Sequence, residues 1–228
     1  MEWWTIPNMW EGAECWIIGG GSSMSRQFGV PEEVIEKVTN RELPIEMLSG
    51  YYSPIHSKHV IGTNVAFKLG TWISVLYFCD KTFFLTNKNE LQNFHNLKVT
   101  DTQNLAPKDY QLHRNIKKLK RDHTHGLTLK KDSVRWNLNS GAAAINFAVQ
   151  AGAKRVLLLG FDMNWDEGGK SHWHSVYARP TPPVVFNRFL QRFPRIAEDA
   201  KKLGVEILNV NPDSAINCFP KVELKEVL

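Results

Sequence analysis

An apolar run that stops at three consecutive glycines is the feature that most restricts the fold of this chain. Residues 15–18 (Cys-Trp-Ile-Ile) are followed by residues 19–23 (Gly-Gly-Gly-Ser-Ser). The pattern predicts a buried strand over 14–19 and a glycine-rich turn, with a helix beginning near Met24 or Pro31. Such a turn offers backbone N–H groups to an anion, and a helix dipole adds to the attraction. An ordinary strand-to-helix turn explains it equally well, because the spacing fits neither GxGxxG nor a P-loop.

A helix, a glycine and a strand follow one another twice in the second half of the chain. Residues 140–152 are rich in small apolar side chains and end at a glycine, and residues 154–162 follow as a nearly continuous apolar strand. The same order returns over 194–210. An apolar strand between helices is typical of the centre of a parallel sheet. The sequence therefore predicts an α/β protein, a single domain over residues 1–228 with a mainly parallel, doubly wound (Rossmann-like) sheet.

The first half of the chain is less regular in its pattern. Strands are expected at 60–64 and 73–80 and a helix at 31–40, while residues 81–85 either continue a strand or begin a helix. Residues 95–138 are interpreted as a partly irregular, basic lid, since the part from 108 to 135 holds nine lysines and arginines against three aspartates. This lid could clamp a diphosphate, follow a nucleic acid or be a solvated loop.

Composition permits an anionic ligand without requiring nucleic acid, since the net charge is only +5. Three scattered cysteines lack metal-ligand spacing, which predicts reduced thiols and a cytoplasmic protein. No signal-peptide pattern is seen, and no window approaches the roughly 18 apolar residues of a membrane span, so none is expected. Trp3, Trp4 and Trp10 predict either packing near the N-terminus or a self-association surface, which makes a homo-oligomer one expectation.

Polar residues follow the predicted strands at one edge of the sheet, where ligands bind in doubly wound folds. We expect them to converge on one cleft. They are Gly20 to Ser23, Thr63, Asn64, Asp80, Asp162, Met163, Asn164 and Asn209 to Ser214. Ser140 and Gly141 open the alanine-rich helix, where Ser140 could be the N-cap and Gly141 could admit a ligand to the backbone. The same pair would serve a purely structural role equally well.

Two histidines lie one residue apart in a polar segment. On an extended backbone His172 and His174 point the same way. An imidazole suits a general base because its pKa lies near the operating pH. The pair could instead bind a metal with Asp162 or Asp166 as a third ligand, or belong to an exposed loop with no such role.

Six short motifs follow one another in an order that resembles a known family. They are Ile17 to Ser23, Ile61 to Asn64, Asn139 to Gly141, Leu158 to Asp162, Ser171 to Ser175 and Asn211 to Ser214. The arrangement resembles the bacterial sialyltransferases of glycosyltransferase family 42. It is also similar to a wider group that includes 6-hydroxymethylpterin diphosphokinase-like proteins and small phage-type proteins. The resemblance extends over roughly residues 14–219.

The resemblance implies transfer of a glycosyl group from a CMP-type nucleotide-sugar donor to an acceptor hydroxyl. Asp162 and Asp166 are too far apart for the DxD motif of metal-using sugar transferases, and residues 162–164 are only a loose variant of it, so the sequence favours a reaction without a metal. The resemblance places His174, or else His172, as the general base and Asp162 near the nucleotide. Asn164 stands about where the family has a phosphate-binding tyrosine. Lysines or arginines of the lid would neutralise the leaving phosphate. The residues that the resemblance places around the cytidine nucleotide are Gly20, Gly21, Ser22, Ser23, Asn64, Ser140 and Gly141.

Two alternatives remain open at the level of sequence. One is a diphosphokinase or nucleotidyl transferase on the same scaffold, which would need a divalent metal held by Asp80, Asp162 and Asp166. The other is a nucleic-acid-directed phage protein that uses the basic segment. The acceptor is not identified, and both a glycan and a modified DNA base are candidates.

Overall fold

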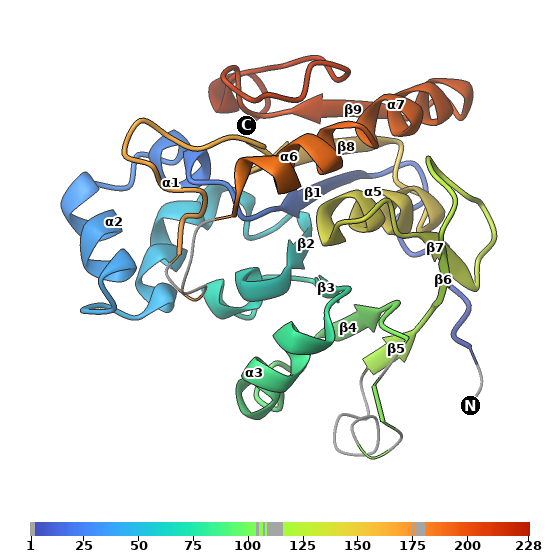
Figure 1. Ribbon diagram of the computed structural model, residues 1–228, viewed down its shortest axis with the longest axis horizontal. Helices are drawn as coiled ribbons and strands as arrows, with labels where there is room; N and C mark the ends of the chain where they lie inside the picture. Colours follow the sequence, from blue (N-terminus) through green and yellow to red (C-terminus); the bar gives the residue numbers. More distant parts are fainter. Residues whose placement is uncertain (1–2, 104, 107, 109–115, 175, 177–180) are drawn as a thin grey trace.

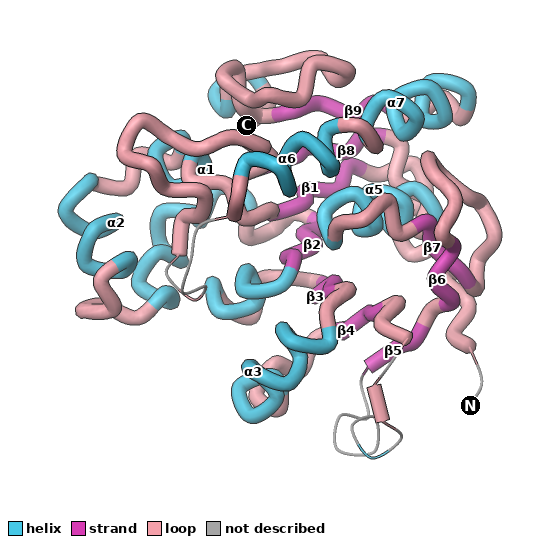
Figure 2. Tube along the Cα trace, in the orientation of Figure 1, coloured by secondary structure: helices cyan, strands magenta, loops and turns pink. Residues whose placement is uncertain are grey.

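Seven parallel strands form one sheet at the centre of the structure (Figures 1 and 2). The computed structural model describes residues 3–103, 105–106, 108, 116–174, 176 and 181–228. The strand order is β5-β4-β3-β2-β1-β8-β9. The strands are β1 (Glu14–Ile18), β2 (His59–Thr63), β3 (Val75–Phe78), β4 (Leu97–Thr100), β5 (Ile116–Lys118), β8 (Arg155–Leu159) and β9 (Glu206–Asn209). All neighbouring pairs are parallel, so the predicted α/β fold with a parallel sheet is confirmed.

The direction of the strand order reverses beside β1. The chain proceeds from β1 to β5 towards one edge and then returns to place β8 and β9 on the other side of β1. Ile17 of β1 therefore lies between Ile61 of β2 and Leu158 of β8. In open parallel sheets, ligands bind outside the carboxyl ends of the strands where the order reverses. This topology places the expected binding region at the ends of β1 and β8.

Helices cover both faces of the sheet, and alternate side chains of each strand point to opposite faces. Ile17 packs in the hydrophobic cluster that includes α5 and α7, whereas Trp16 packs in the other cluster. The first face is covered by α5 (Ser140–Gln150) and α7 (Phe193–Lys202). The second is covered by α1 (Ser23–Gln27), α2 (Glu32–Thr39), η1 (Ile45–Ile55), η2 (Asn64–Leu69), α3 (Lys81–Leu91) and η3 (Leu224–Glu226). One more helix, α6 (Pro183–Leu190), contains no buried residue.

The elements with the clearest patterns lie where the sequence predicted them. Apolar runs became β1, β2, β3, β8 and β9, and the segment at 81–85, which was left open between strand and helix, begins α3. Gly152 follows α5 with φ +104° and Gly204 follows α7 with φ +62°, which are left-handed conformations that favour glycine after a helix. Both helices therefore end at the glycines that the sequence indicated.

Residues 95–138 are more regular than the partly irregular lid that was expected. They contribute β4 and β5 to the main sheet, and β6 (Lys120–Asp122) pairs with β7 (Ser133–Arg135) in a separate two-stranded sheet. Part of the expected lid, at 104, 107 and 109–115, lies outside the described residues.

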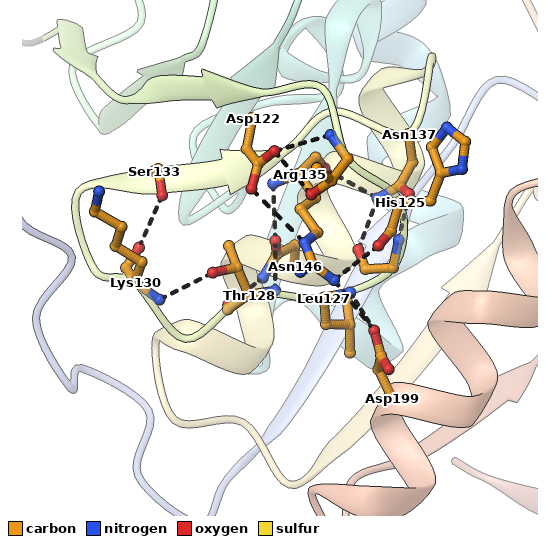
Figure 3. A network of polar contacts seen from close by, with 12 residues as sticks. Asp122, His125, Leu127, Thr128, Lys130, Ser133, Arg135, Asn137, Asn146 and Asp199 are labelled. Carbon is orange, nitrogen blue, oxygen red and sulfur yellow. Dashed lines mark hydrogen bonds and ion pairs between the residues drawn. The ribbon is translucent and has the colours of Figure 1, made fainter.

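Buried amides and ion pairs connect this second sheet to the helices of the first face, as Figure 3 shows. The Asn146 side chain of α5 accepts the N–H of Arg135 at 2.9 Å and donates to the carbonyl of Thr128 at 2.8 Å. Asp199 of α7 accepts the N–H of Leu127 at 2.9 Å and pairs with the Arg135 guanidinium at 3.4 Å. These contacts fix the chain that leads into the start of α5.

Cys15, Cys79 and Cys218 form no disulfide, and the first two are buried as expected for core thiols. Across the described part of the chain, no helix combines the length and the apolar character needed to cross a membrane.

Candidate functional site

A cavity of about 350 Å³ lies at the carboxyl ends of β1, β2, β3 and β8. It brings together residues from each of these ends, from the start of α5, from the histidine segment and from α6. Of the residues singled out from the sequence, those that line it are Gly20, Gly21, Thr63, Asn64, Asp80, Ser140, Gly141, Asp162, Met163, His172 and His174. Ser22, Ser23 and Asn164 line a neighbouring cavity of about 620 Å³ instead, which Asp162 also borders.

The glycine-rich turn lies directly against the end of β8. The N–H of Gly19 donates to Leu159 O and that of Gly21 to Gly160 O, both at 2.8 Å. A Cβ on Gly19 would lie 2.6 Å from the Gly160 oxygen, and one on Gly21 would lie 2.4 Å from the Asp162 carboxyl carbon. Only glycine allows this approach of the two backbones. The glycines are therefore required by packing, whether or not a ligand binds.

Asp162 holds this turn in place from the end of β8. Its carboxylate accepts the N–H and the hydroxyl of Ser23, at 2.9 and 2.5 Å, and the amide of Asn211 at 2.9 Å. The side chain is buried, and burial raises the pKa of its carboxyl group although these hydrogen bonds oppose the rise. Asn164 is exposed and donates to Asp213 O at 3.2 Å. A direct role for Asp162 or Asn164 towards a nucleotide stays a prediction.

A buried tryptophan fixes the histidine segment on the glycine-rich turn. The Trp173 indole N–H donates to Gly19 O at 2.9 Å, and its backbone N–H donates to Gly20 O at 3.1 Å. The rings of His172 and His174, on either side of it in sequence, have centroids 5.2 Å apart. A Cβ on Gly20 would lie 2.9 Å from His172 Cδ2, so this ring covers the turn closely.

Both imidazoles are neutral at pH 7. Burial lowers the pKa of His172 to about 4. Burial, with smaller contributions from His172 and Lys68, lowers the pKa of His174 to about 3. The Nδ1 of His172 shares a hydrogen bond with Ser171 Oγ at 2.8 Å, and the Nδ1 of His174 accepts the N–H of Val176 at 3.3 Å. A neutral imidazole at the wall of a cavity can accept a proton from a bound hydroxyl.

The buried His174 is expected to make the protein sensitive to acid. Unfolded His174 takes up a proton near pH 6.5 but folded His174 only near pH 3, so the free energy of unfolding falls as the pH falls between these values. The free energy of unfolding of the wild type should fall between pH 6.5 and pH 5, and His174→Gln should reduce this fall by roughly 2 kcal/mol. Denaturant unfolding at the two pH values measures it. His95→Gln, at an exposed site, is the control, and equal losses in all three proteins would contradict the assignment.

The amino end of α5 forms another wall of the cavity. Asn139, and not Ser140 as the sequence suggested, is the N-cap: its Oδ1 accepts the N–H of Ala142 at 2.7 Å. Both residue types are good caps, which is why the pattern misplaced the helix start by one residue. Ser140 is the first helical residue, and its hydroxyl donates to Asn64 Oδ1 at 3.4 Å. The two polar residues predicted from separate motifs are thus in contact.

Unusual backbone conformations gather at this cavity. Of the five described non-glycine residues with positive φ, three line it: Asn64 (49°), Leu138 (66°) and Met163 (54°). A fourth, Asn137 (50°), directly precedes Leu138. Such conformations cost of order 1–3 kcal/mol each and concentrate at binding and catalytic sites. Their position independently favours this cavity as the functional one.

The described part of the basic segment places no cation at the cavity, and Arg114 lies outside the described residues. Arg121 pairs with buried Asp101 at 3.0 Å and stacks on the Trp136 ring at 4.3 Å, and Lys120 pairs with Asp132 at 2.6 Å. Among the residues between 95 and 138 that the structure describes, no lysine or arginine lines the cavity, although Trp136 does. Many positive charges of this segment are therefore balanced within it.

An arginine that belongs to none of the sequence motifs lines the cavity from α6. Arg188 lies on the same face of this helix as Val185 and Phe189, which also line the cavity. An apolar stripe interrupted by one arginine, following a proline-rich turn, was the available signal. Without the position of α6, nothing in the sequence pattern indicates that this residue lines the cavity.

The three aspartates proposed for a metal do not meet at one point. Asp80 and Asp162 line the main cavity, whereas Asp166 borders the neighbouring one and pairs with Arg26 at 3.3 Å. Within the described ranges, no three His, Cys, Asp or Glu side chains are grouped closely enough to hold a metal ion.

The architecture is similar to that of a solved glycosyltransferase structure. The whole chain superposes on the structure of the MAf glycosyltransferase from Magnetospirillum magneticum AMB-1, with a TM-score of 0.63 and 10% sequence identity. The chain shares its fold with a glycosyltransferase. It spans only 36% of the length of that protein. At this identity the similarity shows the fold alone, so the predicted likeness to glycosyltransferases is confirmed at that level.

Two further structures are of the sialyltransferase CstII from Campylobacter jejuni, in complex with cytidine-5′-monophosphate and with CMP-3FNeuAc. Their TM-scores are 0.49 and 0.45 and their sequence identities 14% and 13%. Each superposition covers 92% of this chain and 84% of CstII. No protein-family model and no curated protein matches the chain.

Proposed function

We propose that the chain transfers a glycosyl group from a nucleotide-activated donor to an acceptor hydroxyl. The observation that carries the proposal is that one cavity is lined by the glycine-rich turn, the amino end of α5 and two neutral histidines. The amino end of α5 can bind a phosphate, whereas the N–H groups of Gly19 and Gly21 in the turn already donate to carbonyls at the end of β8. An imidazole can accept the acceptor's proton. The fold shared with a glycosyltransferase supports the same activity.

In this proposal the nucleotide lies against Gly20, Gly21, Asn64, Ser140 and Gly141. The acceptor oxygen attacks the anomeric carbon while its proton passes to an imidazole nitrogen. The bond between that carbon and the phosphate oxygen breaks, and the electron pair leaves with the phosphate.

We assign the general base to His172. The resemblance in sequence implies His174 first, but His172 is the more exposed of the two and its ring covers Gly20. The Nδ1 of His174 accepts a backbone N–H, which puts the proton of its neutral ring on Nε2. That tautomer makes His174 the poorer proton acceptor.

A CMP-type donor and a reaction without a divalent metal are the specific forms that we propose. The cytidine follows from the order of the sequence motifs. Metal independence is supported by the positive end of α5 at the cavity, which can balance part of the charge of a phosphate.

Among CMP, CDP, UDP, GDP and ATP, we expect only CMP to stabilise the protein against unfolding. At about one hundred times its Kd, CMP should add about 2.7 kcal/mol to the free energy of unfolding, with no metal present. For a chain of this size, that corresponds to a rise in Tm of roughly 5–10 °C. Asn64→Ala should abolish the rise, whereas Asn93→Ala, at an exposed site away from the cavity, should retain it. The measurement is thermal unfolding with CMP, CDP, UDP, GDP or ATP, each with and without Mg²⁺ or Mn²⁺.

Other outcomes point elsewhere. A shift that requires metal would favour the diphosphokinase or nucleotidyl transferase alternative. Absence of a shift with every nucleotide would refute the donor site and leave the nucleic-acid-directed protein as the leading interpretation, to be tested by the salt dependence of DNA binding.

A further inference from the structure

Arg188 is the single lysine or arginine side chain among the described residues that line the main cavity. The carboxylates there are Asp80 and Asp162, and Asp162 already accepts hydrogen bonds from Ser23 and Asn211. An anionic ligand that enters this cavity therefore meets one cationic side chain, and that side chain comes from α6.

The surroundings of Arg188 leave its charge unbalanced by the protein. No ion pair joins it to a described carboxylate, and its guanidinium lies 5.9 Å from the ring centroid of its neighbour Phe189. Arg195 of α7, by contrast, pairs with Glu198 and Asp199. Arg188 is exposed on α6 and lines the cavity, so its guanidinium is accessible to an anion that enters there.

Unsatisfied donors lie on another wall of the same cavity. The Nδ2 of Asn139 is buried and has no hydrogen-bond partner, although its Oδ1 caps α5. The backbone N–H groups of Ser140 and Gly141 find no acceptor in the described part of the chain. Buried donors are nearly always bonded, so an unpartnered amide at the wall of a cavity indicates a ligand that accepts hydrogen bonds. The positive end of an 11-residue helix favours an anionic one.

We propose that Arg188 binds the donor phosphate and neutralises the charge that builds on it as the glycosidic bond breaks. This inference rests on the proposed function and adds the cationic side chain of the donor-phosphate site. Asn139 and the amino end of α5 bind the phosphate from one wall, and the guanidinium binds it from α6. An arginine can hold two phosphate oxygens at once, and its contribution grows as the leaving oxygen gains charge.

The test compares a nucleoside with its monophosphate. Titration calorimetry of the full chain with cytidine and CMP should show that Arg188→Gln weakens CMP binding 10- to 100-fold and leaves cytidine binding unchanged. The CMP affinity of Arg188→Lys should lie between those of the wild type and Arg188→Gln, because lysine keeps the charge but loses the paired donors. Arg195→Gln, an exposed arginine outside the cavity, is the matched control and should bind both as the wild type does. Turnover of the donor should show a fall in kcat beyond the loss of affinity, since the charge is greater in the transition state.

Two results would overturn the inference. Equal weakening of cytidine and CMP would mean that Arg188 supports the shape of the cavity, and unchanged CMP binding would mean that it does not touch the phosphate. Inorganic pyrophosphate separates this inference from the donor assignment. If the wild type binds pyrophosphate but not CMP, and Arg188→Gln abolishes that binding, the phosphate contact stands and the CMP-type donor falls. If the wild type binds neither pyrophosphate nor CMP, both the phosphate contact of Arg188 and the CMP-type donor are refuted.

Discussion

Gly21→Ala is expected to lower the free energy of unfolding by about 3 kcal/mol and to abolish nucleotide binding. The new methyl group would lie 2.4 Å from the carboxyl carbon of Asp162. The aspartate has no room to yield, because Ser23 and Asn211 hold both of its oxygens. Moving it would leave a buried carboxylate with fewer partners, at a cost of about 1–3 kcal/mol or more for a charged group. Urea unfolding and the CMP titration measure the two effects.

Gly50→Ala provides the matched control for this substitution. A Cβ at Gly50 meets no atom within 4 Å, and its φ lies outside the left-handed region. We expect a change within about 0.5 kcal/mol and unaltered nucleotide binding. A Gly21→Ala protein with wild-type stability would show that the turn is looser than the contacts indicate. Loss of stability with full retention of CMP binding would separate the turn from the donor site.

The central strands could be predicted because burial on both faces leaves a clear mark. β1 and β8 are apolar throughout their cores, and no other element explains such short continuous runs. β4 and β5 escaped detection because they are short and contain lysines. Lys98, for example, is buried yet extends its amine to the carbonyl of Phe94. From sequence alone, a lysine in a strand predicts a position exposed to solvent, because the partner that allows its burial is not visible.

The site was predictable as far as strand topology determines it. Gly20, Asn64 and Ser140 lie around one cavity because parallel strand ends and the start of the following helix meet there. Arg188 and Trp136 could not be placed this way. Their positions depend on how α6 and the second sheet pack, through contacts such as the stacking of Arg121 on Trp136, which join residues far from the motifs. Charge counts along the chain gave no reason to single out Arg188, because they drew attention to the basic segment, whose described cations do not line the cavity.

His172→Ala is expected to reduce turnover of the donor by 10²- to 10⁴-fold while CMP binding remains, because a general base acts on the acceptor and contributes about that factor. His174→Ala should reduce turnover less, and the exposed His95→Ala should not change it. Nucleotide release from the donor selected by thermal unfolding is the assay. A larger loss of turnover in His174→Ala than in His172→Ala would make His174 the general base. Full activity in both variants would exclude either imidazole as the base.

The pH dependence gives an independent check on the same base. Because burial lowers the pKa of His172 to about 4, the ring stays unprotonated on going from pH 7 to pH 5. The kcat/KM of the wild type should therefore hold over this range and fall only near pH 4, whereas a base with the usual histidine pKa of about 6.5 would lose activity by pH 5.5. In kcat, which reports the complex, the falling limb should lie at higher pH, since a bound phosphate beside the ring favours its charged form. A kcat/KM limb near pH 6.5 would mean that the base is more exposed to water than either cavity histidine.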